Sequence, residues 1–463
     1  MTLTSELFWE NLDMLNRTSI AYQCARYALR LNYKSLPENV VHAAKRSLLD
    51  SLGNTIGAYM APGRPILEEV VDELNGPEES TMFGSGRRTS ALNATLFNGW
   101  LLRFSEIMDT AIRGGHQELS IPTVLAVAER EKANGRDFLT SIVVAYELGS
   151  RNVGGSGVNI PAAVGKLMGL TEDQIANAIG ITASHNGRLG ILDADREEYT
   201  MSKNLGSALT GQTAILACIM AKKGFTGPVR VVEGHRGIRD SRENAEGEPS
   251  QEHSVDFSGW RILEDRFKTM PLNTTTQGHV ECTLAIVVEN DLKPEDIESV
   301  RIKASRRETR HTGTSLSKKY PRNAETADHS AFFANALAIK ERSCNLDQFT
   351  TENFTDPVIL DLIERITVEA DASTPDMSRP VTSTVTTKDG RVFQKSQLQP
   401  HGMGGYGQGD DPLTDEELED KFKNLTGKYL NKKQVKDIFD TVWNVEKLDN
   451  IGKLTAQMVF KSR

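Results

Sequence analysis

The chain has 463 residues, of which 38% are hydrophobic and 25% charged, and its formal net charge is −9. This composition is typical of a globular protein and excludes the disordered and fibrous classes, while the length favours two or three domains. The acidic balance argues against nucleic acid as a main partner.

No continuous apolar run approaches the roughly 18 residues that a membrane-spanning helix needs, so we expect no membrane contact. The first residues, MTLTSELFWENLDML, lack the pattern of a secretory signal or transit peptide, which predicts a cytoplasmic protein. The cysteines have no CxxC spacing and indicate reduced thiols rather than disulfides, an iron–sulfur cluster or structural zinc. They are Cys24, Cys218, Cys282 and Cys344.

Helical periodicity dominates from residue 16 to residue 224. Residues 35–61 carry apolar side chains on one helical face, and the segment that begins at Thr171 has acidic residues in its first turn. Residues 202–224 are rich in Gly and Ala, which suits close packing between helices. The first half of the chain therefore predicts a helical domain.

The pattern changes near Pro271, after which three segments alternate apolar and polar residues. Asp389-Gly390 is a hairpin turn between two of these runs, and a helical segment at 325–340 lies among the strands. Helix signals return after the glycine-rich run at 401–412.

In that last part of the chain, Thr414 and Glu417 form a capping box, and another helix is expected to start near Lys432. We therefore predict a mainly α protein with a large all-helical domain built from both chain ends and a smaller inserted α+β domain. The predicted boundaries give residues 1–267 and 403–463 to the helical domain and residues 268–402 to the insert.

The stretch MDTAIRGGHQELSIPTVLAVAERE places His116 after two glycines and just ahead of a helix. The positive end of a helix lowers the pKa of an imidazole, and a neutral imidazole can accept a proton or donate a hydrogen bond to a carboxylate. A capping or packing histidine explains the same spacing. Glu106, Asp109 and Thr110 precede the hinge, where they either orient His116 or form a solvated helix end.

Further basic residues could bind an anion. His185 and Arg188 follow an apolar helix, where they face a cleft or cap the helix end. Lys203 opens a helix, and a cation there is unfavourable for the helix dipole unless it meets an anion. Lys268 lies where the helical domain gives way to the insert, a common place for a cleft, and His279 follows it.

The order of several segments resembles the MmgE/PrpD family, which includes 2-methylcitrate dehydratase, cis-aconitate decarboxylase and iminodisuccinate epimerase. These segments are AKRSLLDSLGNTIGA, DTAIRGGHQELSIPTVLAVAE, SKNLGSALTGQTAILACIMAKKGFTGP, FKTMPLNTTTQGHVE and ETADHSAFFANALAI. The pieces ETADHS and TTQGHVE look more like the dehydratase branch. The resemblance implies a helical domain with an α+β lid, a homodimer, and no metal or organic cofactor.

The resemblance also implies an active site between the helical domain and the lid. The residues expected to be catalytic are His116, His185, Lys203, Glu106 and Asp109, and those expected to bind substrate are Thr110, Lys268, Arg188, Phe333 and His279. Three positions depart from the family pattern. Glu106 stands in place of an aspartate, Gln117 in place of the usual proline, and Phe333 where many members have a tyrosine.

What the resemblance implies is a cofactor-independent hydro-lyase that dehydrates a 2-methylcitrate-like or alkylcitrate-like hydroxy polycarboxylate. Loss of water needs a base for the proton α to a carboxylate, an acid for the departing hydroxyl, and cations for the developing charge. The partner is then a small di- or tricarboxylate. The alternatives are a decarboxylase or epimerase of a related acid, including a secondary-metabolite substrate, and a catalytically silent member that only binds a ligand.

Overall fold

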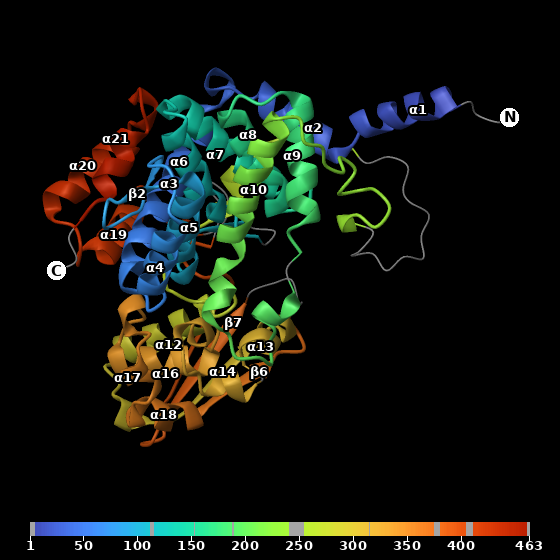
Figure 1. Cartoon of the computed structure of the whole chain (residues 1–463). Helices are drawn as coiled ribbons and strands as arrows, with labels where there is room; N and C mark the ends of the chain where they lie inside the picture. Colours follow the sequence, from blue (N-terminus) through green and yellow to red (C-terminus); the bar gives the residue numbers. More distant parts are fainter. Residues whose placement is uncertain are drawn as a thin grey trace.

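The computed structural model describes residues 5–111, 115–151, 153–187, 189–239, 254–313, 315–374, 380–403 and 411–460. Figure 1 shows a large helical body and a smaller body that joins helices to a sheet. The described chain is mainly α, as the sequence predicts.

The large body is built from both ends of the chain, because α19 packs against α3 and α20 also contacts α3. Figure 1 shows these C-terminal helices, in red, beside the blue N-terminal ones. Helix α1 (Ser5–Arg17) extends away from this body in Figure 1. The longer helices of the body are α2 (Ile20–Arg30), α3 (Glu38–Gly57), α4 (Arg64–Leu74), α5 (Ala91–Phe104), α6 (Ile121–Arg130), α7 (Gly135–Gly149), α8 (Ser156–Leu167), α9 (Glu172–Ser184), α10 (Gly206–Lys222), α19 (Asp415–Thr426) and α20 (Lys432–Val442), followed by the short α21 (Gly452–Thr455).

The predicted helix starts are confirmed where a local cap defines them. The Thr171 side chain accepts a hydrogen bond from the N–H of Gln174 at the start of α9, and Thr414 accepts from Glu417 at the start of α19. Helix α20 begins at Lys432. Each cap satisfies backbone N–H groups that have no partner within the helix.

Within the mainly α fold that the sequence predicts, the large body also contains short antiparallel ladders beside its helices. Strands β1 (Ser80–Thr81) and β2 (Arg88–Thr89) form one two-stranded antiparallel ladder, and β3 (Thr110–Ala111) pairs antiparallel with β4 (Asp265–Arg266) as another. Two-residue strands have no detectable period in the sequence, so patterning could not find them. The β3–β4 ladder brings the segment that leads to His116 beside the segment that leads to Lys268.

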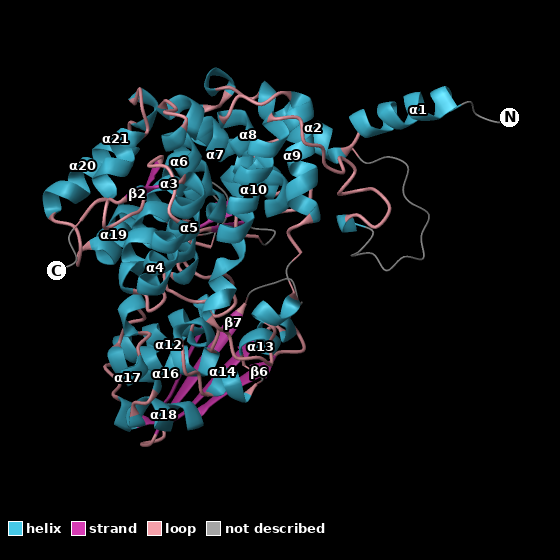
Figure 2. Cartoon of the chain, in the orientation of Figure 1, coloured by secondary structure: helices cyan, strands magenta, loops and turns pink. Residues whose placement is uncertain are grey.

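The smaller body carries a four-stranded sheet in the order β6-β5-β7-β8 (Figure 2). Strand β5 (Ile297–Ala304) is parallel to β6 (Ile366–Ala370) and antiparallel to β7 (Val381–Thr387), which pairs antiparallel with β8 (Val392–Gln397). The β7–β8 hairpin turns at Asp389-Gly390 as predicted, and Gly390 has φ +85°, which favours glycine.

Helices α12 (Gln277–Glu289) and α16 (Ala331–Glu341) pack against this sheet. The other helices of this body are α13 (Arg306–Thr312), α14 (Leu316–Lys319), α15 (Ala324–Ala327), α17 (Thr351–Phe354) and α18 (Pro357–Glu364). The helical segment expected at 325–340 is confirmed, but a break divides it into α15 and α16. Ser330 caps α16 by accepting from the N–H of Phe333, which leaves Asp328 and His329 in the break.

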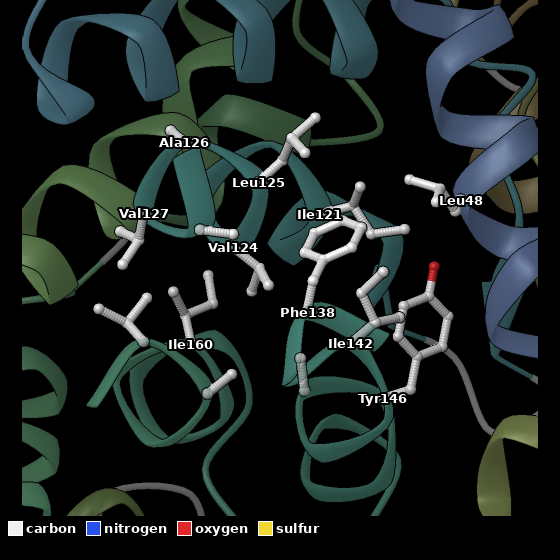
Figure 3. Close-up of a cluster of buried hydrophobic side chains, with 14 of the residues drawn as sticks. Leu48, Ile121, Val124, Leu125, Ala126, Val127, Phe138, Ile142, Tyr146 and Ile160 are labelled. Atoms are coloured by element: carbon white, nitrogen blue, oxygen red, sulfur yellow. The ribbon is translucent and has the colours of Figure 1, made fainter. Parts of the chain in front are cut away.

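Each body has its own hydrophobic core. The larger core, part of which Figure 3 shows, combines side chains between Ile20 and Phe267 with others between Leu413 and Phe460. The smaller core lies between Met270 and Val385. The boundaries at residues 268 and 402 stay a prediction.

One segment, Met201–Lys222, has the length and mean hydropathy of a membrane-spanning helix, although the sequence contains charged and polar residues within it. It ends in α10, which packs against α5, α8 and α9, and 56% of its most apolar window is buried. This placement is that of a core helix.

Candidate active site

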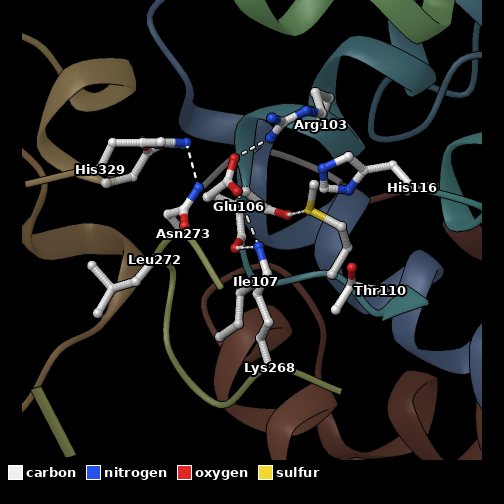
Figure 4. A network of polar contacts seen from close by, with 12 residues as sticks. Arg103, Glu106, Ile107, Thr110, His116, Lys268, Leu272, Asn273 and His329 are labelled. Atoms are coloured by element: carbon white, nitrogen blue, oxygen red, sulfur yellow. Dashed lines mark hydrogen bonds and ion pairs between the residues drawn. The ribbon is translucent and has the colours of Figure 1, made fainter. Parts of the chain in front are cut away.

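Glu106 is at the centre of a buried charged cluster between the two bodies (Figure 4). It follows α5, which is packed against α3, α6 and α10, and its backbone has a left-handed φ of +50°. A non-glycine residue in this region costs free energy, so its surroundings must hold it there. The Glu106 side chain is only 2% exposed.

Three cations surround the Glu106 carboxylate. Arg103 forms an ion pair with Oε2, and Lys203 Nζ is 3.4 Å from the same oxygen. Lys268 Nζ is 3.0 Å from Oε1 and donates a second hydrogen bond, of 2.7 Å, to the Glu106 carbonyl. Burial raises the pKa of Glu106, but these cations outweigh it and hold the pKa well below its usual value. Glu106 is therefore a carboxylate, and the cations exceed its charge.

Lys203 joins the cluster to the smaller body, which we call the lid. Its Nζ is 3.2 Å from both carboxylate oxygens of Asp328 and 3.4 Å from the Glu325 carbonyl. Burial raises the pKa of Asp328 to about 7, although Lys203 opposes this shift. The backbone N–H of Tyr199 also donates to Thr326. Residues 199–203 are thus docked on the lid by hydrogen bonds and charge.

His329 forms a carboxylate–imidazole pair with Asp328 at the edge of this cluster. Its Nδ1 contacts Asp328, and its Nε2 is 2.7 Å from Asn273 Nδ2. Asn273 Oδ1 already accepts from Thr275, so its Nδ2 is the donor to His329. Nε2 is therefore the acceptor, while Nδ1 lies between Asp328 and Lys203, whose Nζ is 3.2 Å away. Burial is the largest cause that lowers the pKa of His329 well below its usual value.

His116 lies on the opposite side of Glu106 in Figure 4, and its side chain is 36% exposed. Its Nδ1 is 2.9 Å from Glu118 Oε1. The pKa of His116 is held well below its usual value by burial first, and then by the positive charge of Arg103. A lowered pKa agrees with the sequence interpretation. The cause differs from the expected one, because α6 begins only at Ile121 and His116 is not in its first turn.

Asp109 and Thr110 lie beside the hinge but have other partners than His116. Tyr146 OH donates to Asp109 Oδ2 over 3.0 Å, and the Asp109 N–H donates to Asp50. Burial and the Asp50 charge raise the pKa of Asp109 to about 7. Thr110 Oγ donates to the Gly115 carbonyl over 3.1 Å. Glu118, rather than Asp109 or Glu106, is the acidic residue bound to His116.

The structure does not bring the other expected residues to this cluster. His185 is exposed at the end of α9 and has no polar side-chain partner among the described residues. Phe333 is fully buried in the lid core against Phe349 and Phe354, which gives it a packing role. His279 is fully buried in α12, and burial lowers its pKa to about 4. Arg188 lies outside the described residues.

The described residues contain two groups with the composition of a metal site, Asp193–His311–His329 and Glu106–Asp328–His329, whose ligand atoms lie within 4.8 Å of one another. A metal ion would have to displace Asn273 from His329 in the first group and the bound cations from Glu106 in the second. Nearby Lys203 would also repel it. The contacts therefore fit the groups as hydrogen-bonded side chains better than as metal ligands.

Sequence reasoning did not identify four members of this arrangement: Arg103, Glu118, Asp328 and His329. The i,i+3 spacing of Arg103 and Glu106 is a local signal for the first ion pair. Asp328 and His329 belong to the ETADHS segment, but they look like helix residues until the break between α15 and α16 is known.

These features define a two-domain, mainly α protein with an acid–base cluster between a helical domain and an α+β lid. The sequence matches the MmgE/PrpD N-terminal domain over residues 22–246 and the MmgE/PrpD C-terminal domain over residues 270–445. The chain belongs to the MmgE/PrpD family, and this membership supports a lyase role at the family level.

Curated relatives resemble it along almost the whole chain. A cis-aconitate decarboxylase-like protein of Aspergillus oryzae is 20% identical, over 96% of this chain and 98% of its own. Cis-aconitate decarboxylases of Aspergillus terreus and Mus musculus are 21% and 22% identical, each over 96% of this chain and over 97% and 93% of their own lengths. These relatives are carbon–carbon lyases, so they do not support the dehydratase branch in particular.

Proposed function

We propose that this protein is a lyase that decarboxylates a small di- or tricarboxylic acid by acid–base chemistry, without a cofactor. The observation that supports it is the cation-rich cluster of Arg103, Lys203 and Lys268 beside the partly exposed His116. An excess of buried cations stabilises the negative charge that develops on a substrate carboxylate and on the carbon that loses CO₂.

In this proposal the cations hold the substrate carboxylates and His116 handles the proton. Loss of CO₂ leaves an electron pair on carbon, stabilised by delocalisation into the neighbouring unsaturated acid. His116 then donates its Nε2 proton to that carbon, and solvent returns a proton to the imidazole. The names of the relatives favour decarboxylation over the other reactions open to this site.

Dehydration of a hydroxy polycarboxylate is the second candidate, and a specific observation favours it. Two carboxyl–imidazole pairs, Glu118–His116 and Asp328–His329, lie on either side of Glu106. Elimination of water needs a base for the α proton and an acid for the hydroxyl, whereas loss of CO₂ needs only one proton donor. The second pair would supply the additional group.

Proton NMR in deuterated water separates these reactions in a single assay. The purified protein is mixed in turn with cis-aconitate, citrate, 2-methylcitrate and a chiral dicarboxylate. Decarboxylation releases CO₂ and leaves one deuterium on a carbon of the allylic system that carried the electron pair, dehydration of citrate or 2-methylcitrate gives a new vinyl signal with every carboxyl group kept, and epimerisation gives α-deuteration without net loss. A matched Lys268→Met variant should lose the signal. No turnover of any of these acids by the wild type would contradict the proposed function.

The proposal also retains a homodimer and a cytoplasmic location. Leu209 and Leu216 on α10 are 48% and 47% exposed, which gives a second copy an apolar surface to cover. The four cysteines are buried free thiols, in keeping with a reducing compartment. Sedimentation velocity tests the dimer, with Leu209→Lys as a variant expected to weaken it.

A further inference from the structure

We propose that Glu118 positions His116 as a proton donor, by donating its own carboxyl proton to Nδ1 so that the ring proton stays on Nε2. The inference rests on the proposed function, since it assigns a protonation state to that same site. Glu118 lies two residues after His116 in the chain, a position typical of a solvated helix start.

The Glu118 carboxyl group is buried, and one of its two oxygens contacts His116. Glu118 is in the 3₁₀ turn Glu118–Ser120, and its side chain is fully buried. Oε1 is 2.9 Å from His116 Nδ1, while Oε2 is buried and has no hydrogen-bond partner among the described residues. A carboxylate needs partners for both oxygens when it is removed from water, because an unpaired buried charge costs several kcal/mol.

A protonated carboxyl group fits this site better. Its hydroxyl at Oε1 donates to Nδ1, and only a neutral carbonyl oxygen is left without a partner, at a smaller cost. Nδ1 must then be an acceptor, so the single proton of the neutral imidazole is on Nε2. The other arrangement, with Nδ1 donating to Oε1, would leave a protonated Oε2 as a buried donor without an acceptor.

Burial is the largest cause that favours the neutral form of both members of the pair. Burial and the nearby Asp109 raise the pKa of Glu118 well above its usual value, against the backbone N–H of Glu118 itself and the cations Lys268 and Arg103. Arg103, Lys268 and Lys203 disfavour an imidazolium at His116, and Glu106 only partly opposes them. Both groups are therefore neutral at rest, with two protons between them.

This arrangement allows a balanced proton transfer. The Nε2–H bond of His116 breaks as the proton bonds to the substrate atom that carries the electron pair. Nδ1 takes the proton of Glu118 as the ring gives up its own, which leaves a neutral imidazole and a Glu118 carboxylate. Solvent then returns one proton to Nε2, and the Nδ1 proton goes back to Glu118. His116 is the catalytic group, and Glu118 acts through it.

Nitrogen NMR of the full-length protein labelled with ¹⁵N-histidine reads the tautomer directly. The His116 signals are assigned by their loss in His116→Asn. At neutral pH we expect Nε2 protonated and Nδ1 bare in the wild type. Glu118→Gln should keep this tautomer, because its amide N–H can donate to Nδ1, whereas Glu118→Ala should lose the single fixed tautomer.

Turnover provides the second readout. Glu118→Gln keeps the hydrogen bond but has no proton to pass on, so kcat should fall about 10²-fold with KM little changed. A protonated Nδ1 with a bare Nε2 in the wild type, or Glu118→Gln turning over at the wild-type rate, would overturn the inference. If either variant fails to fold, the wild-type spectrum still decides.

The two proposals fail in different ways. A wild type that has the expected tautomer but converts none of the four acids would refute the proposed function and leave the Glu118–His116 pair in place. An active wild type with the proton on Nδ1 would do the reverse.

Discussion

Replacing Glu106 with Gln should strongly destabilise the protein, because it removes a carboxylate that three buried cations share. The substitution keeps the size of the side chain and removes its charge. Arg103, Lys203 and Lys268 then remain in the interior without this negative charge, although Lys268 keeps its hydrogen bond to the backbone carbonyl of residue 106.

The magnitude follows from the distances. At an effective dielectric constant near 20, unit charges separated by the 3.0 Å to Lys268 or the 3.4 Å to Lys203 attract each other by roughly 5 kcal/mol. Repulsion among the cations and the cost of desolvation offset much of this. Removing one partner of a buried ion pair typically lowers the free energy of unfolding by about 3–5 kcal/mol, and we expect a loss of this size for Glu106→Gln.

Thermal unfolding followed by circular dichroism measures this loss. With an unfolding entropy of about 2.1 cal/mol/K per residue, a 463-residue chain should show a Tm lower by about 3–5 °C. The matched control is Glu369→Gln, which removes the same charge from the exposed Arg301–Glu369 pair and should leave Tm unchanged. Equal shifts for the two variants would refute the reasoning.

The pH dependence provides an independent check on the same residue. Because the pKa of folded Glu106 is lowered, its ion pairs contribute fully above its unfolded pKa, near 4.3, and the contribution is lost as the pH falls through the folded value. The Tm difference between wild type and Glu106→Gln should therefore be present at pH 7 and smaller below pH 4. A difference that grows in acid would contradict the assignment of Glu106 as a carboxylate.

Three further variants test other residues of the site and the lid. The pKa of Asp109 is about 7 in the folded protein and about 3.9 in the unfolded chain, so wild-type stability should fall as the pH rises from 4 to 7. In Asp109→Asn, Tm should depend less on pH over this range. Phe333→Tyr puts a hydroxyl into the lid core and should cost about 1–3 kcal/mol in unfolding free energy while KM stays unchanged. His185→Ala should keep kcat within about 2-fold of wild type in the deuterated-water assay, since general acid–base groups contribute about 10²-fold or more; a large loss would return His185 to the mechanism.

Much of the fold could be predicted because its signals are local. The capping boxes at Thr171 and Thr414 and the turn at Asp389-Gly390 are each defined by residues within four positions of one another. The features that the sequence did not predict lack a clear local signal. The break between α15 and α16 depends on Ser330 capping a helix inside an otherwise continuous apolar pattern, and the β3–β4 ladder joins segments about 150 residues apart in sequence.

The candidate site could be predicted only in part, because its contacts are long-range. The family resemblance, rather than spacing, predicted that Glu106, Lys203 and Lys268 belong to one site. In the structure both lysines contact Glu106. Spacing could not distinguish His185 from His329 as the second histidine near the cluster. Both lie at helix ends, and only the docking of residues 199–203 on the lid puts His329 against Lys203.

The same cluster links the docking of the two bodies to the proposed proton transfer. Glu106 belongs to the helical domain, Lys268 to the connection and Asp328 to the lid, and Lys203 contacts both carboxylates. Because a buried charge is stable only with its partners, the lid cannot move away without leaving Lys203 or Asp328 poorly paired. The ion pairs that stabilise the docked lid are therefore also the ones that set the positive field around His116. A change that loosens the lid should alter proton transfer even when it touches neither imidazole.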